Sequence, residues 1–288
     1  MKQATDWTDY EIIATGNGQK LERWGSIYLL RPDPQIIWHE SVDMYGFPSL
    51  NARYNAFGKV GEKWDVLRTV PEEFTVSRHG LTFSLKLMKG FKHTGLFPEQ
   101  AVNWDAMQEM IKQAGRPIKV LNLFAYTGGA TMACLQAGAH VTHVDAAQSM
   151  VLRAKRNAEL SHLQDKPCRY IIDDCVKFVN REIRRGNFYD AIIMDPPSFG
   201  RGPNGELWKL EDKLFDLIAT TKQVLSQKPL FYLINSYTTG LQPTVINNLL
   251  KLNFGNYKGE SEAYEVTLPT REGIALPCGC SGLYRFEQ

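Results

Sequence analysis

The sequence IKVLNLFAYTGGATMACLQAGAHVTHVD, residues 118–145, decides the fold class. It begins with an apolar run of strand length at residues 118–123, and a glycine-containing turn follows. Small and apolar residues at 130–137 then indicate a closely packed helix, and residues 140–144 indicate a second strand. A strand, a helix and a second strand in this order predict a right-handed β-α-β unit of a parallel sheet.

The alternation of strands and helices continues toward the C-terminus. Further strands are expected at residues 170–172, 189–194 and 230–234, and further helices at 148–160, 176–184, 210–225 and 245–252. Near the end, strand-like runs at 263–268 and 283–286 have no helix between them, which indicates an antiparallel pair. We therefore predict an α/β fold with a Rossmann-like sheet, mostly parallel, that ends in a C-terminal antiparallel pair.

The first part of the chain has a different character. Residues 1–77 are rich in turn-forming and aromatic residues, and their apolar runs are short. The chain of 288 residues also exceeds the roughly 100–200 residues of one domain. We therefore expect a small β-rich N-terminal domain at residues 1–77 and a Rossmann-like domain at residues 78–288.

The composition is that of an ordinary globular protein. Hydrophobic residues make up 43% of the chain, which is enough for a buried core. The net charge is only +2, so a nucleic acid partner would be held by a local basic face rather than by an overall cationic field. The polar start MKQATDW does not resemble a signal peptide, and no run approaches the ~20 apolar residues that cross a bilayer. We expect a cytosolic protein without membrane contact.

The five cysteines do not indicate a disulfide framework, because their number is odd and three lie in apolar or helix-like stretches. Cys278 and Cys280 form a C-x-C pair, but no second cysteine pair or spaced histidine pair accompanies them. We therefore assign no metal site and interpret both residues as free thiols in a strand.

Candidate site residues follow the predicted strands, because ligands of open α/β sheets bind outside the carboxyl ends of the strands. The turn FAYTGG at residues 124–129 allows a ligand to approach the backbone at a helix start. Asp145 follows the second strand and can accept the two ribose hydroxyls of an adenosine. After the third strand come Asp173 and Asp174, placed to accept from an adenine amino group, and then Cys175.

The fourth strand is followed by a loop of sequence DPPSF. Its two prolines lack N–H donors and have a fixed φ, so they hold rigid carbonyl groups that can receive a donor on a flat substrate. Taken singly, a Gly-Gly turn or an Asp after a strand is more often structural, as a turn or a helix cap. Four such features at successive strand ends favour a ligand site. The expected catalytic residues are Asp195, Pro196, Pro197, Ser198 and Phe199.

Together these motifs resemble the class I S-adenosylmethionine (SAM)-dependent methyltransferases. More narrowly, they resemble the bacterial group that includes large-subunit ribosomal RNA methyltransferases making 5-methylcytosine and 7-methylguanine. The sequence HTGLFPEQ at residues 93–100 is similar to the segment that these enzymes place against the cofactor. The resemblance is specific from about residue 78 onward and looser before it, and the PUA RNA-binding domain of many members is not evident.

The resemblance implies SAM as cofactor and RNA, in particular a ribosomal RNA base, as acceptor. It assigns cofactor binding to Thr94, Gly95, Phe97, Gln100, Phe124, Ala125, Tyr126, Thr127, Gly128, Gly129, Asp145, Ala146, Ser149, Asp173, Asp174, Cys175 and Asp195. Beyond the DPPSF loop, Phe199 or Trp208 could stack on a base, and Arg201 or Lys209 could neutralise phosphate. The alternative is a solvated loop anchored by its aromatic residues.

One departure from the group concerns the reaction route. Its 5-methylcytosine enzymes carry a nucleophilic cysteine after the fifth strand, because carbon methylation proceeds through a covalent adduct. Here the sequence is LINSYTT at residues 233–239, with Ser236 and no cysteine. This favours direct methylation of a nitrogen, although Cys278 or Cys280 could enter the site from elsewhere in the chain.

Other functions remain as alternatives. A methyltransferase acting on protein or a small molecule would have the same cofactor residues. A NAD(P)-dependent oxidoreductase would require G-x-G-x-x-G, which YTGGA at residues 126–130 does not supply. A non-catalytic module that binds SAM or RNA would have no need of the DPPSF loop. We expect the N-terminal domain to recognise the acceptor, and a homodimer is one option for the assembly.

Overall fold

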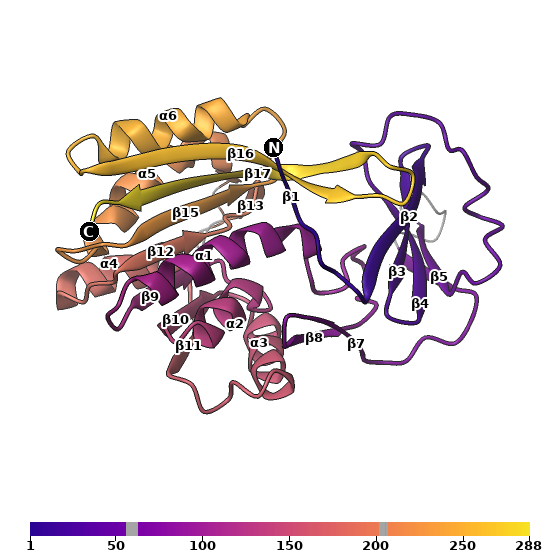
Figure 1. The fold of residues 1–288 in the computed structure, drawn as a ribbon, viewed down its shortest axis with the longest axis horizontal. Helices are drawn as coiled ribbons and strands as arrows, with labels where there is room; N and C mark the ends of the chain where they lie inside the picture. The colour runs from indigo at the N-terminus through magenta and orange to yellow at the C-terminus, as the bar shows by residue number, and fades with distance from the viewer. Residues whose placement is uncertain (56–62, 202–204, 206) are drawn as a thin grey trace. The chain divides into compact units, whose positions relative to one another are not determined.

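We describe the protein from a computed structural model, in which residues 1–55, 63–201, 205 and 207–288 are placed well enough for description. The chain forms two compact units (Figure 1). The Rossmann-like unit comprises Met1–Lys2, Val102–Val266 and Gly279–Gln288, and the N-terminal unit comprises Gln3–Ala101 and Thr267–Cys278. The boundary expected after residue 77 falls inside a strand, Phe74–Arg78, and the units divide after Ala101 instead.

An eight-stranded sheet forms the centre of the Rossmann-like unit, with the order β1-β16-β17-β15-β12-β9-β10-β11. Strands β9, β10, β11, β12 and β15 run parallel, and β17 pairs antiparallel with β15, as the sequence predicts. The strands are β1 (Lys2–Gln3), β9 (Lys119–Leu123), β10 (His140–Asp145), β11 (Cys168–Ile172), β12 (Ala191–Met194), β15 (Phe231–Ser236), β16 (Gly259–Pro269) and β17 (Ala275–Phe286).

Helices cover both faces of this sheet. On one face, an apolar core joins the sheet to side chains of α4, α5 and α6, among them Phe178, Leu214 and Leu250. The other face carries α1, α2 and α3, whose side chains reach β9 and one another. The helices are α1 (Ala101–Gln113), α2 (Gly129–Gln136), α3 (Gln148–Leu160), α4 (Cys175–Arg185), α5 (Leu210–Thr221), the short η2 (Lys222–Val224) and α6 (Pro243–Phe254).

The strand register brings the ends of β9, β10, β12 and β15 to one edge of the sheet. Leu123 at the end of β9 pairs with Val144 of β10 and Met194 of β12. Met194 in turn pairs with Ile234 of β15. The loops that follow these strands therefore begin at the same level, where strand order reverses around β9 and open α/β sheets bind their ligands.

The N-terminal unit is built on a five-stranded sheet with the order β2-β3-β4-β5-β6 and a separate β7-β8 hairpin. This confirms the small β-rich unit expected from the sequence. Its core includes Ile13, Leu21, Leu30, Met44 and Leu50. The elements are β2 (Tyr10–Gly16), β3 (Gln19–Trp24), β4 (Ile27–Pro32), β5 (Ala52–Asn55), β6 (Lys63–Val66), β7 (Phe74–Arg78), β8 (Leu81–Leu85) and the short helix η1 (Pro98–Gln100).

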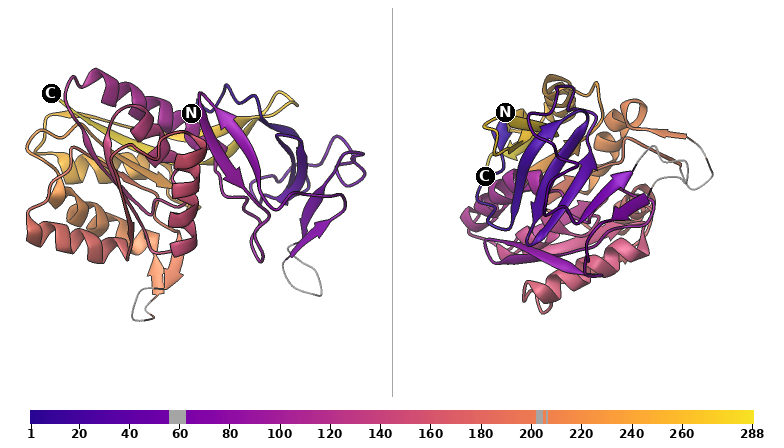
Figure 2. Two further views of the ribbon diagram at one scale, coloured as in Figure 1. Left: turned by 90° about the horizontal axis from the view of Figure 1, so that it is seen from below. Right: turned by 90° about the vertical axis from the view of Figure 1, so that its right-hand side faces the viewer.

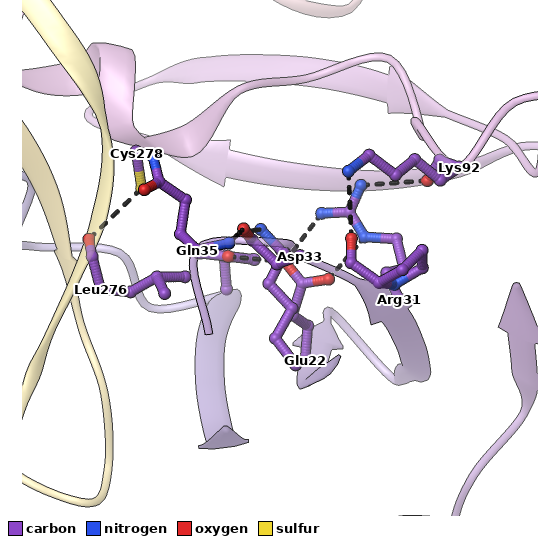
Figure 3. Close-up of polar contacts among 10 residues, drawn as sticks. Glu22, Arg31, Asp33, Gln35, Lys92, Leu276 and Cys278 are labelled. Carbon is purple, nitrogen blue, oxygen red and sulfur yellow. Dashed lines mark hydrogen bonds and ion pairs between the residues drawn. The ribbon is translucent and has the colours of Figure 1, made fainter. Parts of the chain in front are cut away.

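A buried ion pair joins β3, β4 and the segment after β8 (Figure 3). Arg31 donates to both carboxylate oxygens of the fully buried Glu22, at 2.5 and 2.8 Å, and Tyr10 donates to the same carboxylate. A third Arg31 donor reaches the backbone carbonyl of Lys92 at 3.1 Å. Burial alone would raise the pKa of Glu22, but the charges of Arg31 and Lys20 and the hydrogen bonds that it accepts lower this pKa below its usual value.

The helices of the described residues are too short or too polar to cross a lipid bilayer.

Candidate functional site

The loop after β9 has an uncommon backbone conformation. Phe124, Tyr126 and Gly128 have φ angles of 54°, 50° and 83°, in the left-handed region. This region is costly for residues with a Cβ, so the surrounding structure must hold Phe124 and Tyr126 there. Gly128 N–H closes the turn on the Ala125 carbonyl at 2.9 Å, and α2 begins directly afterwards without a side-chain cap.

The two glycines of this loop are required for different reasons. Gly128 adopts a left-handed conformation that a side chain would strain. Gly129 has no such angle, but a Cβ at this position would lie 2.6 Å from the ring of Trp104, a nearly fully buried residue of α1. From the sequence, we explained the two glycines by the approach of a ligand to the backbone. The structure adds a second reason, the packing of Gly129 against Trp104.

Asp145 accepts hydrogen bonds with both carboxylate oxygens, one from the loop after β9 and one from the loop after β10. Its Oδ2 accepts from Tyr126 N–H and its Oδ1 from Ala147 N–H, each at 2.8 Å. The carboxylate is only half-buried, so its remaining lone pairs can accept hydroxyl groups of a ligand at the sheet edge. Ala146 and Ser149 follow Asp145 and are exposed.

The three residues after β11 have separate surroundings. Asp173 forms an ion pair with Arg181 of α4. Asp174 is the N-cap of α4 and accepts from Lys177 N–H at 2.8 Å, which is the structural role that an Asp after a strand often has. Cys175 is buried and its Sγ accepts from Phe124 N–H at 3.2 Å, so it ties the end of β9 to α4. Burial raises the pKa of the Cys175 thiol to about 12.

The DPPSF loop leaves β12 at the same edge. Asp195 is half-buried, Pro196 is buried, and Pro197 and Phe199 are exposed. The Ser198 Oγ accepts a hydrogen bond from the Thr238 hydroxyl at 2.7 Å, which connects the loop to the segment after β15. Ser198 thus fixes the second half of the loop, while the neighbouring Pro197 and Phe199 are exposed.

A two-stranded hairpin continues from this loop and extends away from the sheet layers (Figure 2). It consists of β13 (Phe199–Arg201) and β14 (Leu207–Lys209), and residues 202–204 and 206 between them lie outside the described part of the chain. The Trp208 indole N–H donates to the Pro197 carbonyl at 2.7 Å, and its ring lies 6.4 Å from that of Phe124. Trp208 therefore braces the loop, and its stacking on a base stays a prediction.

The other face of the hairpin is open. Phe199 pairs with Lys209 across the two strands and is 64% exposed, and Lys209 is exposed as well. Arg201 occupies the last position of β13, opposite Leu207. Of the expected acceptor-binding residues, Phe199 and Lys209 thus have side chains that a ligand can reach.

The end of β15 carries a buried serine, Ser236, and lies beside a buried cysteine of β17, Cys280. Ser236 is buried and its hydroxyl accepts from Thr238 N–H at 3.2 Å. Cys280 pairs with Ser236 in the β15–β17 register, donates to the Leu241 carbonyl, and has its pKa raised to about 11 by burial. Burial also raises the pKa of Cys278, a residue of the N-terminal unit, well above its usual value. Both cysteines lie in β17, as the sequence predicts for strand thiols.

The segment expected to approach the cofactor, residues 93–100, belongs to the N-terminal unit. Thr94, Gly95 and Gln100 are buried there, and Phe97 is half-buried with its ring 5.2 Å from that of His93. Arg31 and Lys92 fasten the start of this segment to β4, since Lys92 Nζ donates to the Pro32 carbonyl and the Lys92 carbonyl accepts from Arg31.

A buried polar network at the end of β15 was not predicted from the sequence. Asn235 Oδ1 accepts from Asn103 Nδ2 at 3.0 Å and from Ser281 Oγ at 2.7 Å, and the Tyr264 hydroxyl donates to Asn103 Oδ1 at 2.7 Å. These residues come from α1, β15, β16 and β17, so only the folded sheet brings them together. The network fixes the strand end next to Ser236.

Comparison with known proteins agrees with this arrangement. The family described as S-adenosylmethionine-dependent methyltransferase matches residues 53–213. A SAM-dependent methyltransferase from Agrobacterium tumefaciens has the same fold, with a TM-score of 0.91, 33% identity, and coverage of 98% of this chain and 92% of that one. A second solved methyltransferase, complexed with SAH, shares the fold at a TM-score of 0.77 and 20% identity, over 97% of this chain and 76% of its own.

Curated relatives include the ribosomal RNA large subunit methyltransferase I of Enterobacter sp. (strain 638), 32% identical over 130 residues. This match covers 45% of the present chain and 32% of the relative, so the chain spans about a third of that protein's length. The ribosomal RNA large subunit methyltransferase K/L of Shewanella baltica (strain OS195) is 30% identical over 68% of this chain and 26% of its own. The family match over more than half of the residues, on a fold shared with solved members, shows that the chain belongs to the S-adenosylmethionine-dependent methyltransferases.

Proposed function

We propose that this methyltransferase acts on a base of RNA, most specifically ribosomal RNA, by direct transfer to a nitrogen and without a covalent enzyme–base adduct. The observation that carries the proposal concerns the ends of β12 and β15. There a braced DPPSF loop and a buried Ser236 lie where the strands end, and burial raises the pKa of the Cys280 thiol. An adduct route needs a thiolate at this edge. Direct transfer needs only a well-positioned base.

In this proposal SAM lies along the edge formed by β9, β10 and β11. The loop at residues 124–129 and the first turn of α2, which has no side-chain cap, receive the methionine portion and its carboxylate. Asp145 accepts from the ribose hydroxyls with the lone pairs that its two backbone contacts leave over. Asp173 and Asp174 follow β11, where they would lie close to the amino group of the adenine.

SAM supplies an electrophilic methyl group, and its transfer leaves S-adenosylhomocysteine. The DPPSF loop orients the acceptor base, with the carbonyls before and after Pro196 as the candidate contacts, since Trp208 already engages the Pro197 carbonyl. The nitrogen lone pair forms the new N–C bond as the S–C bond breaks in line with it. The proton released from the nitrogen passes to the Asp195 carboxylate or to solvent.

The RNA acceptor is supported by two independent features. The curated relatives with about 30% identity bear names of ribosomal RNA methyltransferases. The open hairpin face offers an aromatic ring, Phe199, next to a cation, Lys209, a combination that suits a base and its phosphate. We further propose that the N-terminal unit contributes to acceptor recognition, and that the reaction takes place in the cytosol.

The acceptor class can be tested with tritiated SAM. The protein is incubated with total RNA, with total protein and with a small-metabolite extract from a methylation-deficient strain. We expect the label in the RNA fraction, and it should fall when the Asp195→Ala variant replaces the wild type. Label in protein or in a small molecule, with none in RNA, would replace the RNA acceptor by that class.

A further inference from the structure

The loop after β9 is supported from inside the protein by buried polar side chains. They come from β9, β10, α2 and α3: Asn122, His143, Thr131 and Asn157. We propose that His143 is a positioning residue for SAM binding, which holds the loop at residues 124–128 in its left-handed conformation. The proposal rests on the assignment of this loop to the cofactor.

His143 is fully buried and takes part in a chain of hydrogen bonds. Asn122 Nδ2 donates to the Thr131 hydroxyl at 2.9 Å. The Thr131 oxygen lies 2.9 Å from His143 Nδ1, and the hydroxyl or the ring nitrogen is the donor according to the tautomer of the imidazole. Burial lowers the pKa of His143 to about 3, so the ring is neutral.

The ring lies directly under the loop. A Cβ on Gly128 would be 3.5 Å from His143 Cε1 and 3.0 Å from the Ala154 side chain. The backbone of Tyr126 is close enough to raise the pKa of His143 somewhat, although Nε2 makes no hydrogen bond of normal geometry to the described residues. On its other side the ring packs against Tyr170, with centroids 5.5 Å apart. His143 thus fills the space beneath residues 126–128.

Asn157 holds the same loop from α3. It is fully buried, and its Nδ2 donates to the Thr127 carbonyl at 2.8 Å. His143 and Asn157 therefore contact adjacent loop residues from two different elements. A buried polar network of this kind favours the one backbone conformation in which its hydrogen bonds are made. Apolar side chains of the same size would fill the space without favouring that conformation.

The consequence for SAM is pre-organisation. The left-handed residues Phe124 and Tyr126 would relax to ordinary backbone angles if the support were removed. Relaxation would move Tyr126 N–H, which binds Asp145, and the Gly128 turn that starts α2. SAM would then have to order the loop when it binds, which weakens its affinity and leaves the chemical step unchanged.

The test compares His143→Leu with His143→Asn. We expect His143→Leu to weaken SAM binding, measured by calorimetry, by about tenfold or more, as for the loss of a buried hydrogen-bond partner. The KM for SAM should rise while kcat at saturating SAM stays close to wild type. His143→Asn should recover part of the affinity, because its amide group can replace Nδ1 as the hydrogen-bond partner of the Thr131 hydroxyl. Asn157→Leu provides a second variant should His143→Leu not fold.

Thr221→Val is the matched control. Thr221 is a buried residue at the end of α5 whose hydroxyl bonds Tyr232 at 2.6 Å, so its loss lowers stability without touching the loop. Folded His143→Leu and Asn157→Leu proteins that bind SAM like wild type would overturn the proposal, as would an equal loss in Thr221→Val. Asp145→Asn, assayed in parallel, distinguishes a failure of the His143 proposal from a failure of the proposed cofactor site. If this variant also binds SAM normally, the assignment of the loop to the cofactor fails as well.

Discussion

Gly128 and Gly129 are adjacent, but the structure requires glycine at the two positions for different reasons. The sequence shows only the pair, and a ligand at the helix start was the natural interpretation. The left-handed angle of Gly128 belongs to the local turn, whereas the demand at Gly129 comes from Trp104, a residue of another helix. Local chemistry can be predicted from sequence, but a packing neighbour in α1 cannot.

Gly129→Ala should lower the free energy of unfolding by about 1–3 kcal/mol, as overpacked sites do. The added Cβ would lie 2.6 Å from the buried Trp104 ring, so the ring or α2 must shift to accept it. Chemical denaturation measures the change. Combining Gly129→Ala with Trp104→Phe should recover part of the loss, because the smaller ring vacates the overlap. Gly200→Ala, where a Cβ meets nothing closer than 3.8 Å, should be nearly neutral.

Asp145→Ala should weaken SAM binding by about 1.5–3 kcal/mol, the usual worth of a hydrogen bond to a charged group. Asp145 also accepts from Tyr126 and Ala147 N–H, so part of this loss would come from the loop itself. Asp145→Asn retains one acceptor oxygen and should lose less. Calorimetry on the two folded variants tests the assignment, and an affinity equal to wild type in both would refute it.

The residues after β11 show how far motif reasoning reaches. Asp174 has a side-chain oxygen on the helix N-terminus, which is the structural interpretation that an Asp after a strand permits. Asp173 is paired with Arg181, eight positions later in the chain. The sequence predicted that both residues follow the third strand of the sheet. It could not show which of the two carboxylates caps a helix and which is left to bind a ligand.

At the scale of elements, the indole of Trp208 ties the β13–β14 hairpin to the DPPSF loop. Trp208→Phe keeps an aromatic ring beside Phe124 but removes the donor to the Pro197 carbonyl. We expect kcat to fall about tenfold or more through misplacement of the DPPSF loop, since small displacements at a reacting centre are costly. SAM affinity should not change. Lys213→Ala, an exposed change on α5, serves as the control. Unchanged kcat in Trp208→Phe would remove the bracing role.

The Glu22–Arg31 pair makes the N-terminal sheet sensitive to acid. The pKa of Glu22 is lowered in the folded protein, so its contribution to stability is complete above about pH 4.5, the unfolded value, and is lost as the pH falls through the folded pKa. At pH 7, Glu22→Gln should cost about 3–5 kcal/mol, because Arg31 stays buried without its counter-charge. Below pH 4 the difference from wild type should shrink.

Denaturation curves at pH 7 and below pH 4 measure this effect. Glu287→Gln, which neutralises an exposed carboxylate near the C-terminus, should match wild type at both values. A difference between Glu22→Gln and wild type that is the same at both values would contradict the lowered pKa.

The sequence predicted the C-terminal antiparallel pair but not the length of its two strands. Strands β16 and β17 are longer than the two runs seen in the sequence, and residues 267–278 at their tip belong to the N-terminal unit. Contacts between distant positions hold the tip there, among them Thr15 with Glu272 and Glu11 with Arg271. A truncated chain that starts near Arg78 would lack most of β7 and expose this tip, so point variants are the sounder test of the N-terminal unit.

At the scale of the whole molecule, the fold was predictable because strand and helix periodicity is local and repeated. The α/β sheet, its antiparallel end and the β-rich first unit are confirmed, and the family follows from motifs at successive strand ends. The division between units was less accessible, since it depends on where residues 79–101 and 267–278 pack. The acceptor is a property of surfaces that cofactor motifs do not describe.

The central claim is direct, SAM-dependent methylation of RNA, and trapping with 5-fluorocytidine-containing RNA tests it most directly. An enzyme that attacks the base covalently is captured by this RNA, whereas an enzyme that transfers directly to nitrogen is not. We predict that the wild-type protein transfers tritiated methyl groups to unsubstituted RNA at a rate that falls about 100-fold in Asp195→Ala, and that it forms no stable complex with the fluorinated RNA. A complex cross-linked through Cys278 or Cys280 would contradict the account and restore carbon methylation of cytosine.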